Sequence, residues 1–415
     1  MRLNDDTPDA LALAAAAAEP SPIEAGDKDV GSKTAIVAVT LAGIGAFLNL
    51  YATQPILPLL AQLFHAGKSA VGMTVSGSTL GVALAAPIVG VLAERVGRRR
   101  VIIASTFVLA VPTLLAATSV TLPALIWWRF LQGVVMPGIF GVTIAYITEE
   151  WSASAVAKVM SLYVSGTVLG GFLGRVFTGF AATHSLIPNV RPSWHIGFIA
   201  IGLCDLVFGV LIWRWLPADR PGHASARRFN PIRHLRNKQL LATYAVGFSV
   251  LFSLVAVFTY ITFHLAAPPF LLTPAQLSWL FVVYLVGLFV TPVAGVWTGR
   301  VGSRISLIVA VIAAMIGVSL TLVHSIPVIL VGLVLCSSGV FVCQSASTSY
   351  IQRAAPEGGR ASAAGQYVSF YYIGGSLAGV LPAYVWNHGE WTACVVLVLI
   401  VQAITIAIAA SVWEN

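Results

Sequence analysis

Long uninterrupted blocks of apolar residues are the feature that most restricts what this chain can fold into. Each block approaches or exceeds the ~20 residues that a helix needs to cross a bilayer. Backbone groups inside lipid must form their hydrogen bonds within the segment, so we interpret the blocks as helices. The sequence therefore predicts an all-α membrane protein with twelve transmembrane helices. The blocks cover residues 34–60, 70–93, 101–119, 122–147, 156–182, 194–216, 239–266, 275–298, 304–323, 326–349, 362–385 and 391–412.

The first 33 residues have a different composition from the blocks. They place Asp5, Asp6 and Asp9 before an alanine-rich run, and no basic start leads directly into an apolar core as in a signal peptide. This composition favours a disordered cytosolic tail. We predict a tail over 1–33, a six-helix bundle over 34–216, a basic cytosolic linker over 217–238 and a second six-helix bundle over 239–415.

Lysine and arginine are distributed unevenly about the blocks. If the N-terminus is cytosolic, the basic residues lie on the cytosolic side, apart from Lys68 and Arg191 outside and Arg129 and Arg175 within the membrane. This is the positive-inside pattern, which explains the net charge of +8 by topology and not by a nucleic-acid partner. We expect a multi-pass protein of a bacterial inner membrane, with both termini cytoplasmic and a linker that contacts anionic lipid headgroups.

One segment of the first half recurs in the second. The sequence APIVGVLAERVGRR at 86–99 aligns with TPVAGVWTGRVGSR at 291–304, and they share proline, glycine and arginine positions at one constant offset. Two parallel six-helix repeats are typical of secondary transporters, whose binding site lies near the bilayer midplane between the repeats. The repeat therefore predicts transport of a small molecule.

Three motifs give the chain a family resemblance. The first resembles the loop 2–3 signature of the major facilitator superfamily, with Glu where Asp is usual, and the second is similar to a helix 4 signature of drug:proton antiporters. The third is similar to the antiporter signature of helix 5 but has Gly171 where that pattern has proline. The motifs are Gly90-x-x-x-Glu94-Arg95-x-Gly97-Arg98-Arg99, Arg129-x-x-Gln132-Gly133 and Gly166-x-x-x-Gly170-Gly171-x-x-Gly174.

Further stretches, including those at 49–60 and 371–379, resemble the YnfM-type efflux branch of that superfamily. The resemblance implies the major facilitator fold and a monomer that exports small organic molecules by rocker-switch alternating access, with protons as the counter-transported ion. A proton-coupled uptake symporter or a facilitator is the alternative within transport, and a non-transporting membrane sensor is an alternative of another class.

The resemblance also implies a conformational latch on the cytosolic side. Gly90 is expected to let the second helix approach the eleventh, whose N-terminal dipole suits Glu94. The neighbouring arginines are expected to pair with two glutamates at the end of helix 4. The alternative is that the arginines only set topology. The latch residues are Gly90, Glu94, Arg95, Gly97, Arg98, Arg99, Glu149 and Glu150.

Charged residues inside the membrane are costly and therefore indicate functional sites. Arg129 is interpreted either as part of substrate binding or proton coupling, or as a clamp on backbone carbonyls. Arg175 shares a helical face with Thr167 and Thr178 and is expected to bind cargo in a central cavity. Asp205 is either a proton carrier or a structural partner of Arg175 or of a hydroxyl.

Other polar and aromatic residues inside the blocks complete the predicted substrate site. They are Asn49, Thr53, Gln54, Tyr260, His264, Gln344, Tyr367 and Tyr372. The first block carries no carboxylate, so the centre should be net positive and should favour anionic, zwitterionic or neutral amphiphilic cargo. Motifs of common enzymes and zinc-type cysteine spacings are absent from the sequence, so we predict no enzyme, metal or cofactor.

Overall fold

The computed structural model describes residues 33–185, 192–219, 234–356 and 359–414, and its regular elements there are helices. The predicted tail, apart from Lys33, and most of the predicted linker lie outside the described residues. The first half contains α3 (Lys33–Leu50), η1 (Gln54–Ile56), α4 (Leu57–Leu63), α5 (Lys68–Val96), α6 (Arg98–Ala116), α7 (Leu122–Val135), α8 (Pro137–Glu150), α9 (Ala153–Thr183) and α10 (Trp194–Trp215).

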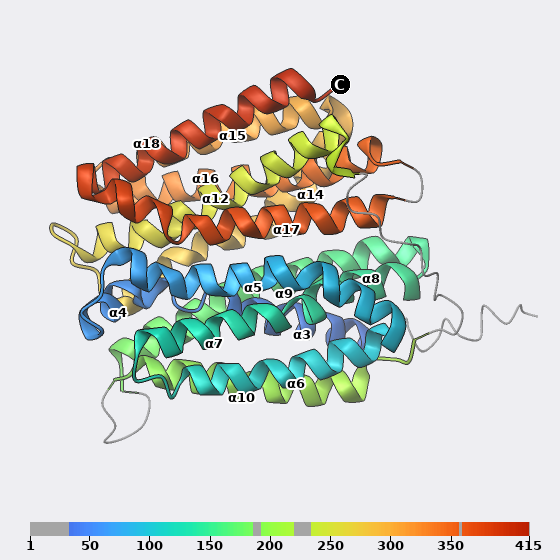
Figure 1. The fold of residues 1–415 in the computed structure, drawn as a ribbon, viewed down its shortest axis with the longest axis horizontal. Coiled ribbons are helices and arrows are strands. Elements are labelled where there is room, and N and C mark those ends of the chain that lie inside the picture. The colour runs from blue at the N-terminus through green and yellow to red at the C-terminus, as the bar shows by residue number, and fades with distance from the viewer. Residues whose placement is uncertain (1–32, 186–191, 220–233, 357–358, 415) are drawn as a thin grey trace, which may run out of the picture.

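The second half follows the same order of long helices. Its elements are α12 (Lys238–Ala266), α13 (Pro274–Trp279), η2 (Leu280–Val286), α14 (Gly287–Val301), α15 (Ser303–Leu320), α16 (Ile326–Ala354), α17 (Arg360–Ala378) and α18 (Leu381–Val412). In Figure 1 the first half fills the lower part of the view and the second half the upper part, and α5 and α17 run along their boundary.

Within the described residues, eleven helices are long and apolar enough to cross a membrane. The predicted crossing that is not among these eleven, over 362–385, begins with α17, whose sequence RASAAGQYVSFYYIGGSLA mixes small, polar and tyrosine residues. This crossing continues into the start of α18, where the chain leaves helical geometry at Gly389 and Glu390 before the last crossing. The prediction of an all-α membrane fold is confirmed, and α17 is less apolar because it packs against α5 and α12.

Several predicted blocks are broken helices. The first block ends as α3 at Leu50, forms a turn over 51–53 and resumes through η1 and α4. Pro55 and Pro137 stand at the restarts of the first and fourth crossings, where a missing N–H is tolerated. These breaks leave backbone carbonyls without helical partners inside the membrane-spanning region.

The sequence repeat is also a repeat of backbone geometry. Gly97 and Gly302 have φ angles of 101° and 88°, and each separates a helix from the next one, α5 from α6 and α14 from α15. Side chains rarely adopt this conformation, so glycine is needed at both turns. Arg95 and Arg300 lie just before these turns. We call the end of the bundle that holds both turns the basic end.

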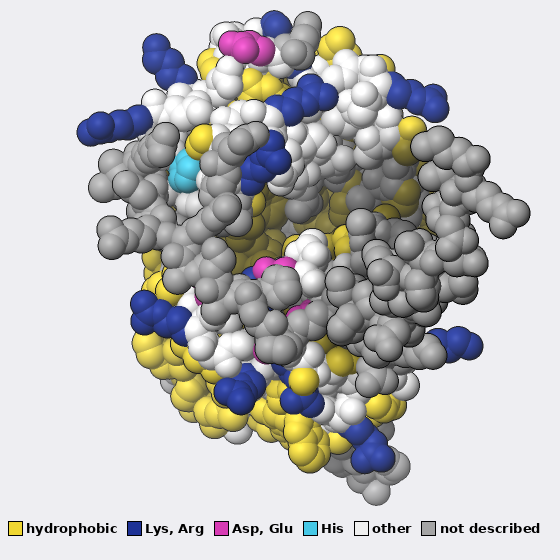
Figure 2. All heavy atoms as spheres, turned by 90° about the vertical axis from the view of Figure 1, so that its right-hand side faces the viewer, with side chains coloured by type: hydrophobic (Ala, Val, Ile, Leu, Met, Phe, Trp, Pro, Cys, Tyr) yellow, Lys and Arg dark blue, Asp and Glu magenta, His cyan; other side chains and the backbone are white. Residues whose placement is uncertain are grey.

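The basic end is hollowed between the two halves. Figure 2 views this end and shows dark-blue lysine and arginine side chains around a depression whose depth is lined by hydrophobic side chains. The opposite end, which carries the loops around Gly67 and Leu271, is closed by contacts between the halves. The described conformation is therefore open toward the basic end.

Candidate functional site

The closure at the far end is made largely by backbone. A Cβ on Gly72 of α5 would collide with the carbonyl oxygen of Gly379, just after α17. One turn deeper, the Ser76 hydroxyl donates to the Ser376 carbonyl at 2.5 Å, and the Ser376 hydroxyl donates to the Ser76 carbonyl at 3.1 Å. The two helices cross at this point because four small residues permit backbone contact.

Aromatic side chains complete this seal. The Lys68 ammonium lies 5.8 Å from the Phe263 ring centroid and 5.0 Å from that of Trp386, which joins the start of α5 to the second half. The Tyr260 hydroxyl donates to the Gly379 carbonyl at 2.8 Å. His264 stacks on Trp391 with centroids 5.8 Å apart. Tyr260 and His264 were predicted to line the cavity, but the structure places Tyr260 in the seal and His264 beside it.

Arg129 is held as a clamp inside the first half. Its guanidinium donates to the carbonyls of Asn49, Leu50 and Thr74 at 2.7, 2.5 and 3.1 Å, and to the side chains of Gln132 and Ser78 at 2.5 and 3.2 Å. These five bonds match the five donors of an arginine. The side chain is fully buried, so the alternative of a carbonyl clamp is the one that the geometry supports.

The clamp explains how the first crossing can be broken inside a membrane. Asn49 and Leu50 lie at the end of α3, where their carbonyls lose their helical partners. An unpaired carbonyl in a water-free region costs several kcal/mol. Arg129 supplies those partners and so stabilises the turn at 51–53.

Asp205 lies in a polar cluster next to this clamp. The Asn49 amide donates to both of its carboxyl oxygens, at 3.0 and 2.9 Å. The Asn49 side-chain oxygen accepts from Thr113 at 2.7 Å and from Gln132 at 3.1 Å. Asp205 is fully buried. The predicted pairing with Arg175 does not occur, because the carboxyl faces α3 and α6 instead.

Arg175 has a different environment, at the junction of the two halves. Its Nε donates to Gln54 Oε1 at 2.8 Å and its Nη1 donates to the Gly171 carbonyl at 2.5 Å. Gln54 in turn donates to Thr259 of α12 at 3.1 Å. The second terminal nitrogen of Arg175, Nη2, forms no hydrogen bond with a described residue. The Arg175 side chain is 2% exposed.

Three aromatic rings surround the Arg175 guanidinium. The ring centroids of Phe281, Tyr284 and Tyr51 lie 4.5, 4.8 and 4.9 Å from its Cζ atom. Two of these rings come from η2 in the second half, so the cation contacts both halves. Among the described carboxylates none lies within ion-pair distance of Arg175, since the ion pair found there joins Arg98 to Glu149. The site is a cation with unused donors and no counter-charge.

Sequence reasoning missed the rings around Arg175. Tyr51 was not predicted because an aromatic residue in an apolar block is usually part of the packed core. Phe281 and Tyr284 lie in an apolar block of the second half, and no motif in the sequence connects them to Arg175. Both rings lie on η2, the 3-10 segment between α13 and α14.

The remaining predicted site residues are dispersed. Thr53 accepts a hydrogen bond from Thr74 at 3.2 Å within the first half. The Tyr372 ring lies 5.9 Å from the Phe140 ring across the boundary between the halves. Tyr367 is buried with its ring against Gly247. Gln344 is exposed on α16.

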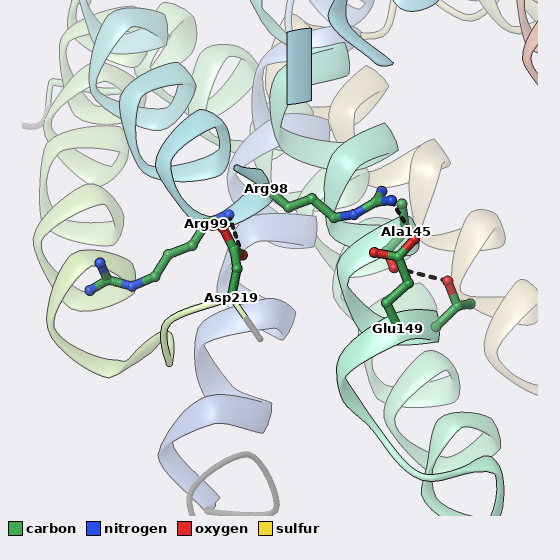
Figure 3. Close-up of polar contacts among 6 residues, drawn as sticks. Arg98, Arg99, Ala145, Glu149 and Asp219 are labelled. Carbon is green, nitrogen blue, oxygen red and sulfur yellow. Dashed lines mark hydrogen bonds and ion pairs between the residues drawn. The ribbon is translucent and has the colours of Figure 1, made fainter. Parts of the chain in front are cut away.

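The arginine cluster at the first turn binds within its own half. Arg98 forms an ion pair with Glu149 at the end of α8, and the backbone N–H of Arg99 donates to Asp219 at 2.9 Å (Figure 3). The Arg99 guanidinium also donates to the carbonyls of Leu216 and Trp213. Asp219 thereby caps the start of α6, where a carboxylate suits the helix dipole.

The predicted latch between the halves is not formed in this conformation. The pairing of Arg98 with Glu149 is present, but it cannot join the halves because both residues belong to the first half. Gly90 faces open space and Glu94 and Arg95 are exposed, so the expected contact with α17 is not formed in this conformation. Glu150 is 4% exposed. The expected contact between Gly90 and α17 is absent because the halves are separated at the basic end.

Comparison with known proteins agrees with this geometry. Residues 39–379 and 260–414 match the family described as the Major Facilitator Superfamily. The inner membrane transport protein YnfM of Escherichia coli (strain K12) is 30% identical over 374 residues, covering 88% of each chain. The uncharacterized MFS-type transporter YybF of Bacillus subtilis (strain 168) is 29% identical over 379 residues, covering 90% of each chain.

A solved structure shares the fold. A bacterial homolog of the human lysosomal transporter Spinster, in an inward-facing and unoccupied conformation, superposes with a TM-score of 0.76 at 13% identity, covering 91% of this chain and 97% of the other. At this identity the likeness concerns the fold alone. Since the family match spans most of the described helices, the chain belongs to the major facilitator superfamily and is a multi-pass membrane transporter, not an enzyme.

Proposed function

We propose that this transporter exports small organic molecules from a bacterial cytoplasm by rocker-switch alternating access, driven by proton antiport. The basic end is the cytoplasmic end, because flanking lysine and arginine favour that side. Both termini and the linker are then cytoplasmic, and the hollow of Figure 2 is the entry for cargo from the cell interior. Anionic lipids contact the basic end, and the protein acts as a monomer.

The single observation that supports a cargo class is the environment of Arg175. An arginine keeps its charge at any physiological pH, and a charge without a partner inside a membrane protein is costly. Its rings cover the guanidinium while two terminal nitrogens retain unused donors. An anionic group on the cargo would supply the missing acceptor. Anionic or zwitterionic amphiphiles are therefore favoured over lipophilic cations.

A second conformation must close the basic end. There Gly90, Glu94 and Arg95 would meet the start of α17, because α5 and α17 already cross at the opposite end. The open space at Gly90 leaves room for that approach. The latch therefore forms in the outward-facing state. Gly97 forms the turn between α5 and α6, and Arg98 and Arg99 form contacts within the first half.

Transport into proteoliposomes tests the function and the role of Arg175. A panel of organic acids, zwitterions and cations would be offered with a pH gradient of either sign. Accumulation opposite to the direction of proton flow is the expected result. Accumulation along the proton flow would establish a symporter, and equilibration that does not depend on the gradient would establish a facilitator. If no compound is transported, the result would favour the membrane sensor.

Variants of Arg175 give the matched comparison. Arg175→Lys keeps the charge but loses the planar fork, so we expect a rise of about tenfold or more in the half-saturating concentration of an anionic cargo. Arg300→Lys, at the exposed basic end, is the control and should transport like the wild type. Unchanged half-saturation in both Arg175→Lys and Arg175→Ala would remove Arg175 from the cargo site.

A further inference from the structure

A buried carboxyl and the cargo cation contact the two ends of one short segment. The carboxyl is Asp205, which is bound to Asn49 at the start of residues 49–54. At the other end of this segment, Gln54 binds Arg175 and also Thr259 of the second half. We call residues 49–54 the connector.

The connector contains the turn at 51–53, and its carbonyls are bound by side chains of α7 and α9. Arg129 binds the Asn49 and Leu50 carbonyls, and the Thr178 hydroxyl donates to the Ala52 carbonyl at 2.5 Å. The Tyr51 ring of the same segment lies on Arg175. A shift of Asn49 is therefore transmitted along a bonded backbone of six residues to both the cargo cation and the second half.

Asp205 has little to compensate a negative charge. Helices α3, α6 and α9 pack against α10. Toward the carboxyl, α3 presents the Asn49 amide, and the Thr113 hydroxyl of α6 lies beside it and donates to Asn49 Oδ1. The buried ionisable groups of α9 are engaged elsewhere: Arg175 binds Gln54 and Tyr163 donates to the Phe140 carbonyl. Arg129 binds the Asn49 carbonyl and Gln132, so it is connected to the carboxyl only through uncharged groups, and Cys204 is the titratable neighbour on α10 itself.

A sealed carboxyl in such a place holds a proton, because an isolated charge out of water is too costly to persist. When the proton leaves, the site must change to solvate the charge. The Asn49 amide is the donor that contacts both oxygens, so a change in the charge of the carboxyl acts first on Asn49. We propose that Asp205 is the proton-binding site of this transporter and that the connector transmits its protonation state to Arg175 and to the second half.

The second half provides an uncharged counterpart. There α18 packs against α12 and α15, and Gln402 of α18 borders a cavity of about 20 Å³ beside Ser253. Gln402 Oε1 and Ser253 Oγ have no hydrogen-bond partner among the described residues. The space suits one water molecule. Because glutamine cannot ionise, Gln402 is a buried polar control position in the second half.

The first experiment detects the proton directly, without cargo. The purified full-length protein would be titrated while the infrared carbonyl stretch of protonated carboxyl groups is followed. We expect a titrating band that shifts on labelling with 13C-aspartate, is lost in Asp205→Asn, and persists in Gln402→Leu and Glu150→Gln. A titrating band that labelling does not shift, or no band in the wild type, would overturn the assignment even if Asp205→Asn fails to fold.

The second experiment tests the connector. Spin labels at Gln62 and Leu271, both exposed at the closed end, report the distance between the halves in acidic and alkaline buffer. We expect the wild type and Gln402→Leu to shift their distance distribution with pH, and Asp205→Asn to show one distribution at both values. A pH shift retained in Asp205→Asn, or absent in the wild type, would refute transmission.

The inference rests on the proposed function, but the two can fail separately. A protein that accumulates cargo against a proton gradient while Asp205 does not titrate refutes the proton site alone. A protein in which Asp205 titrates and shifts the halves, but which transports no compound of the panel, refutes the proposed cargo export alone.

Discussion

At the scale of single residues, the two embedded arginines show that one residue type at similar depth can have opposite roles. Arg129 uses all five donors on protein acceptors, while Arg175 leaves donors unused at the boundary between the halves. The sequence locates both residues and Asp205, because embedded charge is rare. It could not assign the clamp, because three of the acceptors are backbone carbonyls.

The clamp predicts a stability defect for Arg129→Lys. A lysine offers three donors on one nitrogen and cannot reach five acceptors. Unpaired buried acceptors should lower the free energy of unfolding by about 3 kcal/mol. A fall in the thermal unfolding midpoint of the detergent-solubilised protein would show this, with Arg300→Lys as control. A midpoint equal to that of the control would contradict the clamp.

At the scale of elements, the crossing of α5 and α17 controls which end of the bundle is open. Gly72→Leu places a side chain against the Gly379 carbonyl, which cannot retreat because it is backbone. A penalty of 1–2 kcal/mol on the closed seal changes the ratio of the two conformations about 5- to 30-fold. We therefore expect more of the outward-open state, seen as a longer distance between labels at Gln62 and Leu271.

Gly90→Leu is the matched control on the same helix. Its added side chain meets open space in this conformation, so the seal distance should not lengthen. An equal lengthening in both variants would mean that leucine acts on α5 in general and not through the crossing. The sequence predicted an approach of α5 to α17 but at Gly90, because a single sequence cannot say which of two conformations forms a contact.

At the scale of the whole molecule, the lysine and arginine residues at the basic end predict that this end faces the cytoplasm. Single cysteines at Leu271 and Lys158, which are exposed at opposite ends, should differ toward a membrane-impermeant maleimide. In intact cells position 271 should be labelled and position 158 protected until the membrane is permeabilised. The wild type is the control, since its cysteines lie within the helices. Labelling at 158 alone would invert the topology.

The whole fold was predictable because helix-length blocks, the repeat and the charge asymmetry each follow from the bilayer as solvent. The breaks within the crossings could not be predicted. A proline is tolerated at the start of a helix, but its presence does not require that the preceding residues form a turn. The turn at 51–53 exists through Arg129, a residue from another helix. Site geometry that depends on such breaks therefore needs the structure.

The contact of Asp219 with α6 determines where this chain could be divided into two separately synthesised pieces. Asp219 follows α10, caps α6 and lies before the undescribed stretch that leads to the second half. A cut after Asp219 leaves the first piece with its own helix cap, whereas a cut before it removes that carboxylate. The chain is thus built so that its first six crossings carry their own terminus, and the remainder can be supplied as a second polypeptide.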